Sequence, residues 1–250
     1  MVHDVGPVGF VATQHRVAAP LLPLRLVTDR NRGGALLSYA VATMAQLGLF
    51  LMLSYFLQQQ LSFGPMLAGL AFMPLTLGLL AGATQVAPRL LHRAGTRVLI
   101  GGGFATAALG ITLLTGIGID ANLWTDIMPG TILLGVGSGI AITVGQSVAT
   151  SNVAPSDAGV ISATVNVASQ VGAALGTALL STIHTLSTAT HPTNPSVDAT
   201  MHGYTVTITA AAILMGLAAL IATILINHTT STDRSPDGAD TSLDLAVELV

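Results

Sequence analysis

Long stretches of the chain carry no charged residue. These stretches cover residues 33–88, 98–119, 127–156, 158–197 and 199–232. A helix needs about 20 apolar residues to cross the hydrocarbon core of a bilayer, so the first stretch is long enough for two crossings, divided at Gly64–Pro65 after a run of glutamines. The pattern predicts six membrane-spanning helices, at 34–58, 65–88, 97–118, 127–150, 157–184 and 203–226.

Helix is the expected form of every span. Backbone amides in lipid must be satisfied within a helix or in a closed barrel, and barrel strands would alternate polar and apolar residues, which these runs do not. Composition agrees, because 51% of the residues are hydrophobic and 8% are charged, against about 25% charged in a soluble domain. We therefore expect an all-α membrane protein, a bundle of six transmembrane helices.

The basic residues indicate the orientation of the bundle. All 8 of them are arginines, and six spans place every one on the same side. They are Arg16, Arg25, Arg30 and Arg32 before the first span, Arg89, Arg93 and Arg97 between the second and third, and Arg234 after the sixth. Because positive residues concentrate in cytoplasmic loops, we expect a multi-pass plasma-membrane protein with both termini in the cytoplasm.

Composition also divides the chain along its length. Residues 1–33 lack the apolar core of a signal peptide and are predicted to form a cytoplasmic or interfacial segment, in which 20–23 skims the membrane. Residues 34–226 form the six-span domain. The Ser/Thr/Asp-rich residues 227–250 are predicted to be a disordered acidic cytoplasmic tail.

A short internal repeat predicts the architecture. The second span opens with Pro65-Met-Leu-Ala-Gly, the fifth is preceded by Pro155-Ser-Asp-Ala-Gly, and Gly82 and Gly172 follow at the same spacing. The two copies occupy the second helix of each group of three and run in opposite directions. This is typical of the inverted three-helix repeats of secondary transporters, although chance matches among common membrane residues are the alternative.

The chain resembles the C-terminal half of a fourteen-span multidrug efflux transporter, a drug:proton antiporter of the major facilitator superfamily. The resemblance covers nearly all of residues 20–226. It is carried by Pro23-Leu-Arg-Leu, Asp29-Arg-Asn-Arg, Leu57-Gln-Gln, Pro65-x-x-Ala-Gly-Leu-Ala-Phe-Met-Pro74, Arg93-Ala-Gly-Thr-Arg97, Pro129-Gly, Asp157-Ala-Gly, Asn166, Gln170-x-Gly and Ala174-Leu-Gly. Ser169 stands where family members often place a basic residue.

The resemblance implies efflux of lipophilic, often cationic, small molecules across the lipid bilayer. It also implies a partner, because in the family the N-terminal spans carry the groups associated with proton coupling. We therefore interpret the chain as a half-transporter that needs an N-terminal half, from the same gene or a separate chain. The alternative is a six-span scaffold, or an inactive truncation product, that transports nothing.

Candidate cavity residues follow one stripe of the fifth span. Ser162, Asn166, Gln170, Ala173 and Thr177 recur at three- and four-residue steps and so share a helix face. Polar side chains in a membrane face partners or water, which predicts either a substrate cavity or interhelical hydrogen bonds. The same two alternatives apply to the buried amides Gln46 and Gln146.

The turn after the second span is a candidate gate. Arg89, Arg93 and Arg97 are four residues apart, and Gly95 breaks the helix between them. The turn either anchors the topology by its positive charge or latches one transport state. Pro74 removes a backbone hydrogen bond and should kink the second span, as a hinge or as a static bend.

Other residues are given simpler structural roles. Glycine runs, such as those beginning at Gly78, Gly135 and Gly172, should allow close helix contact. Trp124, Tyr204 and His184 are placed at the outer ends of spans, at the membrane interface. Met44, Met52 and Met73 either form an adaptable pocket, fill the core or face lipid.

Several function classes are excluded. A net charge of −3 argues against a nucleic-acid partner. We expect no cofactor, no metal site and no enzyme, because paired metal ligands and a Ser/His pair are missing from the spans. A proton antiporter needs an ionisable membrane group, and no Asp, Glu, Lys or Arg lies in the interior of a predicted span. The six helices are therefore expected to shape a passage without driving transport alone.

Overall fold

The computed structural model describes residues 30–91, 93–118, 121–150, 158–190 and 197–226. Within them, six helical segments are long and apolar enough to cross a membrane, which confirms the predicted number. The segments are Gly33–Gln60, Pro65–Leu91, Thr96–Gly116, Leu123–Val148, Gly159–Ala189 and Val197–Leu225. The expectations for residues 1–29 and 227–250 lie outside the described residues.

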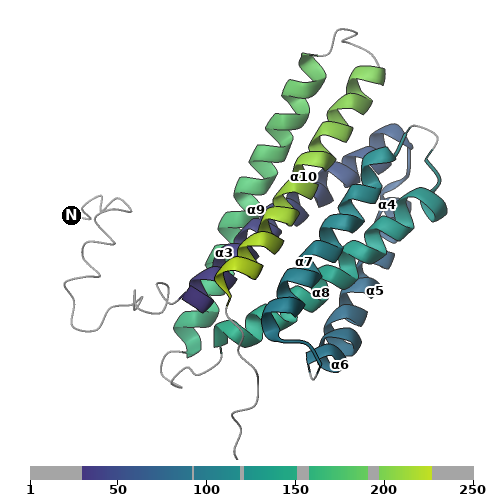
Figure 1. Cartoon of the computed structure of the whole chain (residues 1–250). Coiled ribbons are helices and arrows are strands. Elements are labelled where there is room, and N and C mark those ends of the chain that lie inside the picture. The colour runs from purple at the N-terminus through teal and green to yellow at the C-terminus, as the bar shows by residue number, and fades with distance from the viewer. Residues whose placement is uncertain (1–29, 92, 119–120, 151–157, 191–196, 227–250) are drawn as a thin grey trace, which may run out of the picture.

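Most of each segment is α-helix, and short π-helical or 3-10 turns join or end the helices (Figure 1). In chain order the elements are α3 (Arg30–Tyr55), η1 (Phe56–Gln60), α4 (Pro65–Ala71), α5 (Met73–Ala81), η2 (Gly82–Val86), α6 (Ala87–Leu91), α7 (Thr96–Leu113), η3 (Leu114–Gly116), η4 (Leu123–Ile127), α8 (Met128–Thr150), α9 (Ala158–Ala189) and α10 (Val197–Leu225).

The helices pack in the pattern that an inverted repeat requires. The second span packs on the fourth through α5 and α8, and the fifth packs on the first through α9 and α3. The third span contacts the fourth (α7 with α8), and the sixth contacts the first (α10 with α3). If the first, second and third spans are exchanged with the fourth, fifth and sixth, the contact of the second with the fourth becomes that of the fifth with the first. In the same way, the contact of the third with the fourth becomes that of the sixth with the first. The structure therefore agrees with two three-helix repeats.

Glycines set the distances between the helices, as predicted. A Cβ atom on Gly82 would collide with the backbone of Val136 on α8, and one on Gly172 would collide with the backbone of Ala40 on α3. These two glycines hold equivalent places in the two repeats. In a membrane, small residues allow backbones to approach where no hydrophobic force drives helices together, so these contacts fix the packing of the repeats.

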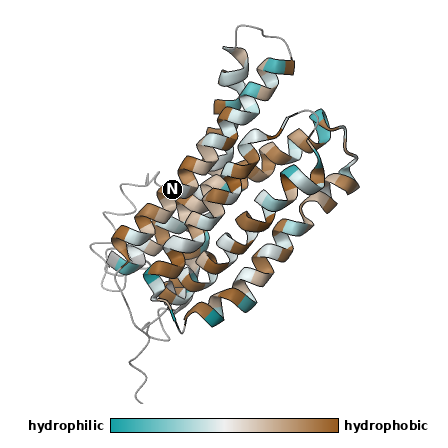
Figure 2. Ribbon diagram, turned by 45° about the vertical axis from the view of Figure 1, so that its right-hand side comes forward, coloured by the Kyte–Doolittle hydropathy of each residue, from teal (hydrophilic) through white to brown (hydrophobic). Residues whose placement is uncertain are grey.

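Hydrophobic residues run along most of the length of the helices, as Figure 2 shows. Large side chains such as Leu77, Leu109 and Ile213 are exposed, whereas small ones such as Ala45, Ala107 and Ala211 are buried between helices. This distribution suits a bundle whose solvent is lipid rather than water, because lipid tails are as apolar as leucine. The chain is a multi-pass membrane protein.

The fifth and sixth spans are longer than predicted. Helix α9 continues past the expected end at 184 to Ala189, and α10 begins at Val197 rather than at 203. Consequently His184 and Tyr204 are not the terminal residues of their helices, as the predicted bounds implied. Tyr204 lies seven residues into α10, about two helical turns, and it is buried. Trp124, by contrast, is exposed in η4 at the start of the fourth span.

Two neighbouring glycines of α7 test the role of close packing. A Cβ atom on Gly103 would lie 2.8 Å from the carbonyl oxygen of Gly137 on α8, whereas one on Gly102 meets nothing within 4 Å. We predict that Gly103→Ala lowers the free energy of unfolding by about 1–3 kcal/mol, the usual cost of overpacking. Gly102→Ala should leave it unchanged or raise it slightly. Unfolding of the purified chain in detergent micelles measures both, and equal effects would contradict this packing role.

Candidate functional site

A polar cavity lies where α3, α8 and α9 meet. Its volume is about 240 Å³. It is lined by Tyr39 from α3, Gln146 from α8, and Ser162, Val165, Asn166 and Ser169 from α9. Gln146 and two members of the predicted stripe of the fifth span, Ser162 and Asn166, therefore share one cavity. Gln170, from the same predicted stripe, is exposed and does not line it.

The polar cavity can bind a molecule by hydrogen bonds. An amide offers both donors and an acceptor, and a hydroxyl offers both functions, so Gln146, Asn166 and Ser162 suit a neutral polar group. Sequence reasoning did not select Tyr39. The signal was present, because Tyr39 precedes Gln46 by seven residues, which places both on nearly the same face of a helix.

A second cavity lies farther along α3 and is almost wholly apolar. It has a volume of about 250 Å³ and is lined by Gln46, Leu47, Leu49, Phe50, Leu53, Phe72, Leu75 and Leu134. The rings of Phe50 and Phe72 lie with their centroids 4.4 Å apart. Among the described residues of this lining, Gln46 is the one with a polar side chain. The cavity therefore suits a lipophilic group with a single hydrogen-bonding position.

The methionines considered for an adaptable pocket line neither cavity. Met52 is buried in the bundle, Met44 is half-buried and Met73 is exposed. The core-filling and lipid-facing interpretations therefore describe them better than the pocket does.

The two cavities lie in sequence along one side of α3. Tyr39 and Gln46 are separated by two helical turns, about 10 Å along the axis. Among the described residues, neither lining contains an acidic or basic side chain. The arrangement offers a polar position and an apolar position to one elongated molecule, and selection there depends on hydrogen bonds and apolar contact rather than on ion pairing.

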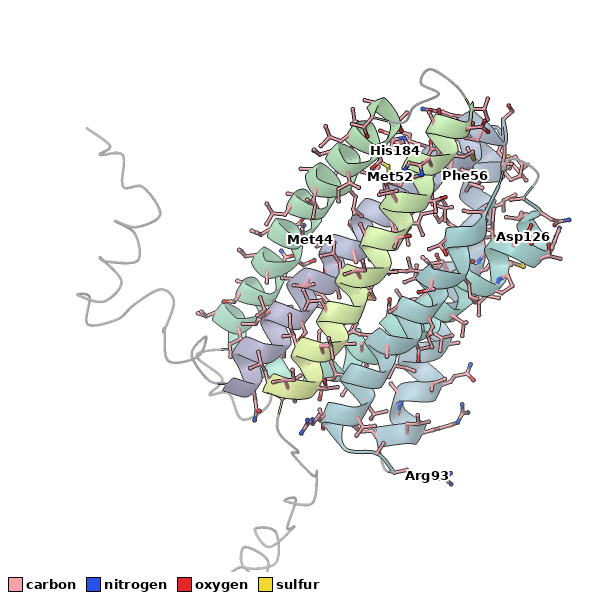
Figure 3. The ribbon with its side chains drawn as sticks, turned by 45° about the horizontal axis from the view of Figure 1, so that its top comes forward. Met44, Met52, Phe56, Arg93, Asp126 and His184 are labelled. Carbon is pink, nitrogen blue, oxygen red and sulfur yellow. The ribbon has the colours of Figure 1, made fainter. Side chains whose placement is uncertain are left out.

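The turn between α6 and α7 holds the arginines predicted to gate or anchor the bundle. Arg89, in the last turn of α6, donates from Nη1 to the backbone oxygen and to Oε1 of Gln85, each at 3.4 Å. Arg93 is exposed and lies at one end of the bundle (Figure 3), and Arg97 is half-buried in the first turn of α7. Gly95 caps α7 with an extended backbone, φ −63° and ψ 152°. A negative φ is open to any residue, so this turn does not require glycine there.

The second span is interrupted just before Pro74. Helix α4 ends at Ala71, Phe72 has φ −90° and ψ −6°, and α5 begins at Met73 with Pro74 in its first turn. Proline is well tolerated in the first turn of a helix because its missing N–H has no partner there. The break lies beside the apolar cavity, because Phe72 lines that cavity, so any hinge motion at Pro74 would move its wall.

Six membrane-spanning helices in two inverted groups of three, with uncharged cavities along the first span, define a secondary-transporter bundle. The comparison with known proteins agrees. The sequence profile of the Major Facilitator Superfamily matches residues 5–177, more than half of the chain. The protein belongs to this superfamily. Its members transport small molecules across membranes, and they are not enzymes.

Relatives of the chain carry names that refer to drug resistance or export. The chain is 43% identical to the puromycin resistance protein pur8 of Streptomyces alboniger over 89% of its own length and 46% of the relative. It is 33% identical to the cephamycin export protein CmcT of Amycolatopsis lactamdurans over 73% of its own length and 38% of that relative. It is 31% identical to the multidrug resistance protein B homolog of Mycobacterium tuberculosis H37Rv over 70% of its own length and 33% of that relative. The chain thus spans less than half the length of each of these relatives.

Introduced cysteines can test whether the polar cavity is wet. The chain has no native cysteine, so each introduced thiol is the only one present. We predict that Ser162→Cys reacts with a small water-soluble thiol reagent in membrane vesicles, because Ser162 lines the polar cavity. Ile161→Cys, one residue earlier on α9, should react at least about tenfold more slowly, because Ile161 is 6% exposed and a buried thiol is inert. Equal rates would contradict the cavity.

Proposed function

We propose that the chain is the C-terminal six-helix half of a drug exporter, with lipophilic small molecules as its substrates. The observation that carries the proposal is the pair of uncharged cavities along α3 in a protein of the Major Facilitator Superfamily. The names of the relatives from Streptomyces alboniger and Amycolatopsis lactamdurans, which refer to antibiotic resistance and export, support the direction of transport.

The substrate is proposed to lie along α3, with its lipophilic part near Phe50 and its polar part near Gln146 and Asn166. Burying an aromatic or aliphatic group contributes about 25 cal/mol per Å² of apolar surface removed from water. Hydrogen bonds to the amides then select among lipophilic molecules. Among the described residues, neither lining contains an acidic side chain that could pair with a cationic substrate.

The energy for export is proposed to come from an N-terminal half. Charged residues of the described spans lie near their ends, as Arg89, Arg97, Asp126 and Asp198 do, and proton pathways in membranes are marked by ionisable groups within them. Alternating access also needs a second bundle for this one to rock against. We further propose that the protein resides in the plasma membrane with the arginine-bearing turn in the cytoplasm, as the positive-inside rule predicts.

Reconstitution separates the half-transporter from a scaffold. Vesicles would contain this chain alone, or this chain together with the part of the puromycin resistance relative that it does not match. We predict that a pH gradient drives export of a lipophilic dye only in the second case. Export by this chain alone would contradict the need for a second half, and no export in either case would favour the scaffold.

Amide substitutions test the path itself. In the combined system, replacing both Gln146 and Asn166 with Ala should reduce export of a hydrogen-bonding substrate roughly five- to tenfold, since two interactions of about 0.6 kcal/mol each are lost. Val167→Ala, next to Asn166 but outside the cavity lining, should leave export unchanged. An unchanged rate in the double variant would remove these amides from the path.

A further inference from the structure

A cluster of side chains lies near the end of the bundle where α9 ends and α10 begins. These side chains line neither of the two cavities. Helix α9 contributes His184 and Thr188, α10 contributes Gly203 and Tyr204, and η1 contributes Phe56. Figure 3 shows His184 and Phe56 near this end, with Arg93 at the opposite end. The cluster therefore lies far from the arginine-bearing turn.

Three rings connect three spans in this cluster. The imidazole of His184 lies with its centroid 4.4 Å from that of the Tyr204 ring, at an interplanar angle of 43°. The Tyr204 ring meets the ring of Phe56 edge to face, with centroids 5.3 Å apart and an angle of 79°. Tyr204 also forms a side-chain hydrogen bond with Gln60. Any change at His184 therefore acts on the contact between the first, fifth and sixth spans.

The Nδ1 atom of His184 lies close to the backbone of α10 at Gly203. A Cβ atom on Gly203 would lie 3.0 Å from Nδ1 of His184 and still closer to Oγ1 of Thr188. Both of these atoms are buried, and neither has a hydrogen-bond partner among the described residues. Leaving a buried polar group unsatisfied costs about 1–3 kcal/mol, so the pair needs an explanation beyond packing.

We propose that His184 is a proton-binding site of this bundle. A modest rotation of the Thr188 side chain lets its hydroxyl oxygen accept a hydrogen bond from Nδ1–H, which fixes the tautomer and leaves the lone pair of Nε2 as the base. A hydronium ion then transfers its proton to Nε2 and leaves as water, and the imidazole becomes a cation. The Tyr204 ring stabilises that cation, because a ring centroid within about 6 Å attracts positive charge.

Few other titratable groups of the described residues lie next to His184. Among the described residues, Tyr204 is the titratable side chain that faces His184 from α10, and Tyr55, which ends α3, interacts electrostatically with Tyr204. Asp198 and His202, both on α10, are exposed. The consequence for transport rests on the proposed function, in which a proton arriving at this end would alter how α9 packs on α10 and α3.

Proton binding is measured directly, without substrate or a second half. The chain carrying ¹⁵N-labelled histidine is placed in phosphatidylcholine nanodiscs, and its imidazole nitrogen resonances are followed from pH 4.5 to 8.5. His184→Gln identifies the relevant signal, and His202→Gln is the control that retains it. We expect the His184 nitrogens to pass from the neutral to the cationic pattern, with resonances of labelled Tyr204 changing at the same midpoint.

Thr188 provides the sharper test. Thr188→Val keeps the side-chain shape and removes the hydroxyl, so the proton affinity of His184 should fall about tenfold, because hydrogen bonds to charged groups are the stronger ones. Thr185→Val is the matched control on α9, since the Thr185 hydroxyl donates to the Ser181 carbonyl instead. A His184 signal that stays neutral throughout, or equal effects of the two valine variants, would overturn the proposal. Either result would leave the export proposal standing.

Discussion

Backbone contact between helices is the constraint on which this structure depends. Apolar side chains gain little by leaving lipid for the bundle interior, so the helices associate where small residues let their backbones meet. Gly82 and Gly172 make such contacts at equivalent places, between η2 and α8 and between α9 and α3. Two cavities lie between the packed helices along one side of α3 and make up the candidate site.

The cavities differ in chemistry, and this difference determines what the bundle can do. Near Tyr39 the lining offers amide and hydroxyl groups, and near Phe50 it is almost wholly apolar. Without an acidic or basic group in the described linings, binding there does not change the charge of the protein, so it is not coupled to proton movement at that site. In the proposed function, this bundle therefore shapes the passage and an N-terminal half supplies the energy.

Much of the fold could be predicted from the sequence, because charge is so costly in a membrane that its absence marks every span. The ends of the fifth and sixth spans could not, since hydropathy does not show how far a helix continues beyond the apolar core. That error placed Tyr204 at an interface, although Gly203 allows α9 to approach and bury it. Gln146 and Asn166 line the same cavity because α8 and α9 pack near each other. No spacing along the chain indicates this.

The central claim is that a lipophilic substrate binds along the uncharged side of α3. Photo-cross-linking measures this most directly, with a light-activated lipophilic drug analogue added to membranes that contain the chain together with an N-terminal half. We predict adducts on the cavity-lining parts of α3, α8 and α9, and their loss when excess unlabelled drug competes. Adducts spread over the lipid-facing sides of α7 and α10, unaffected by competitor, would contradict it.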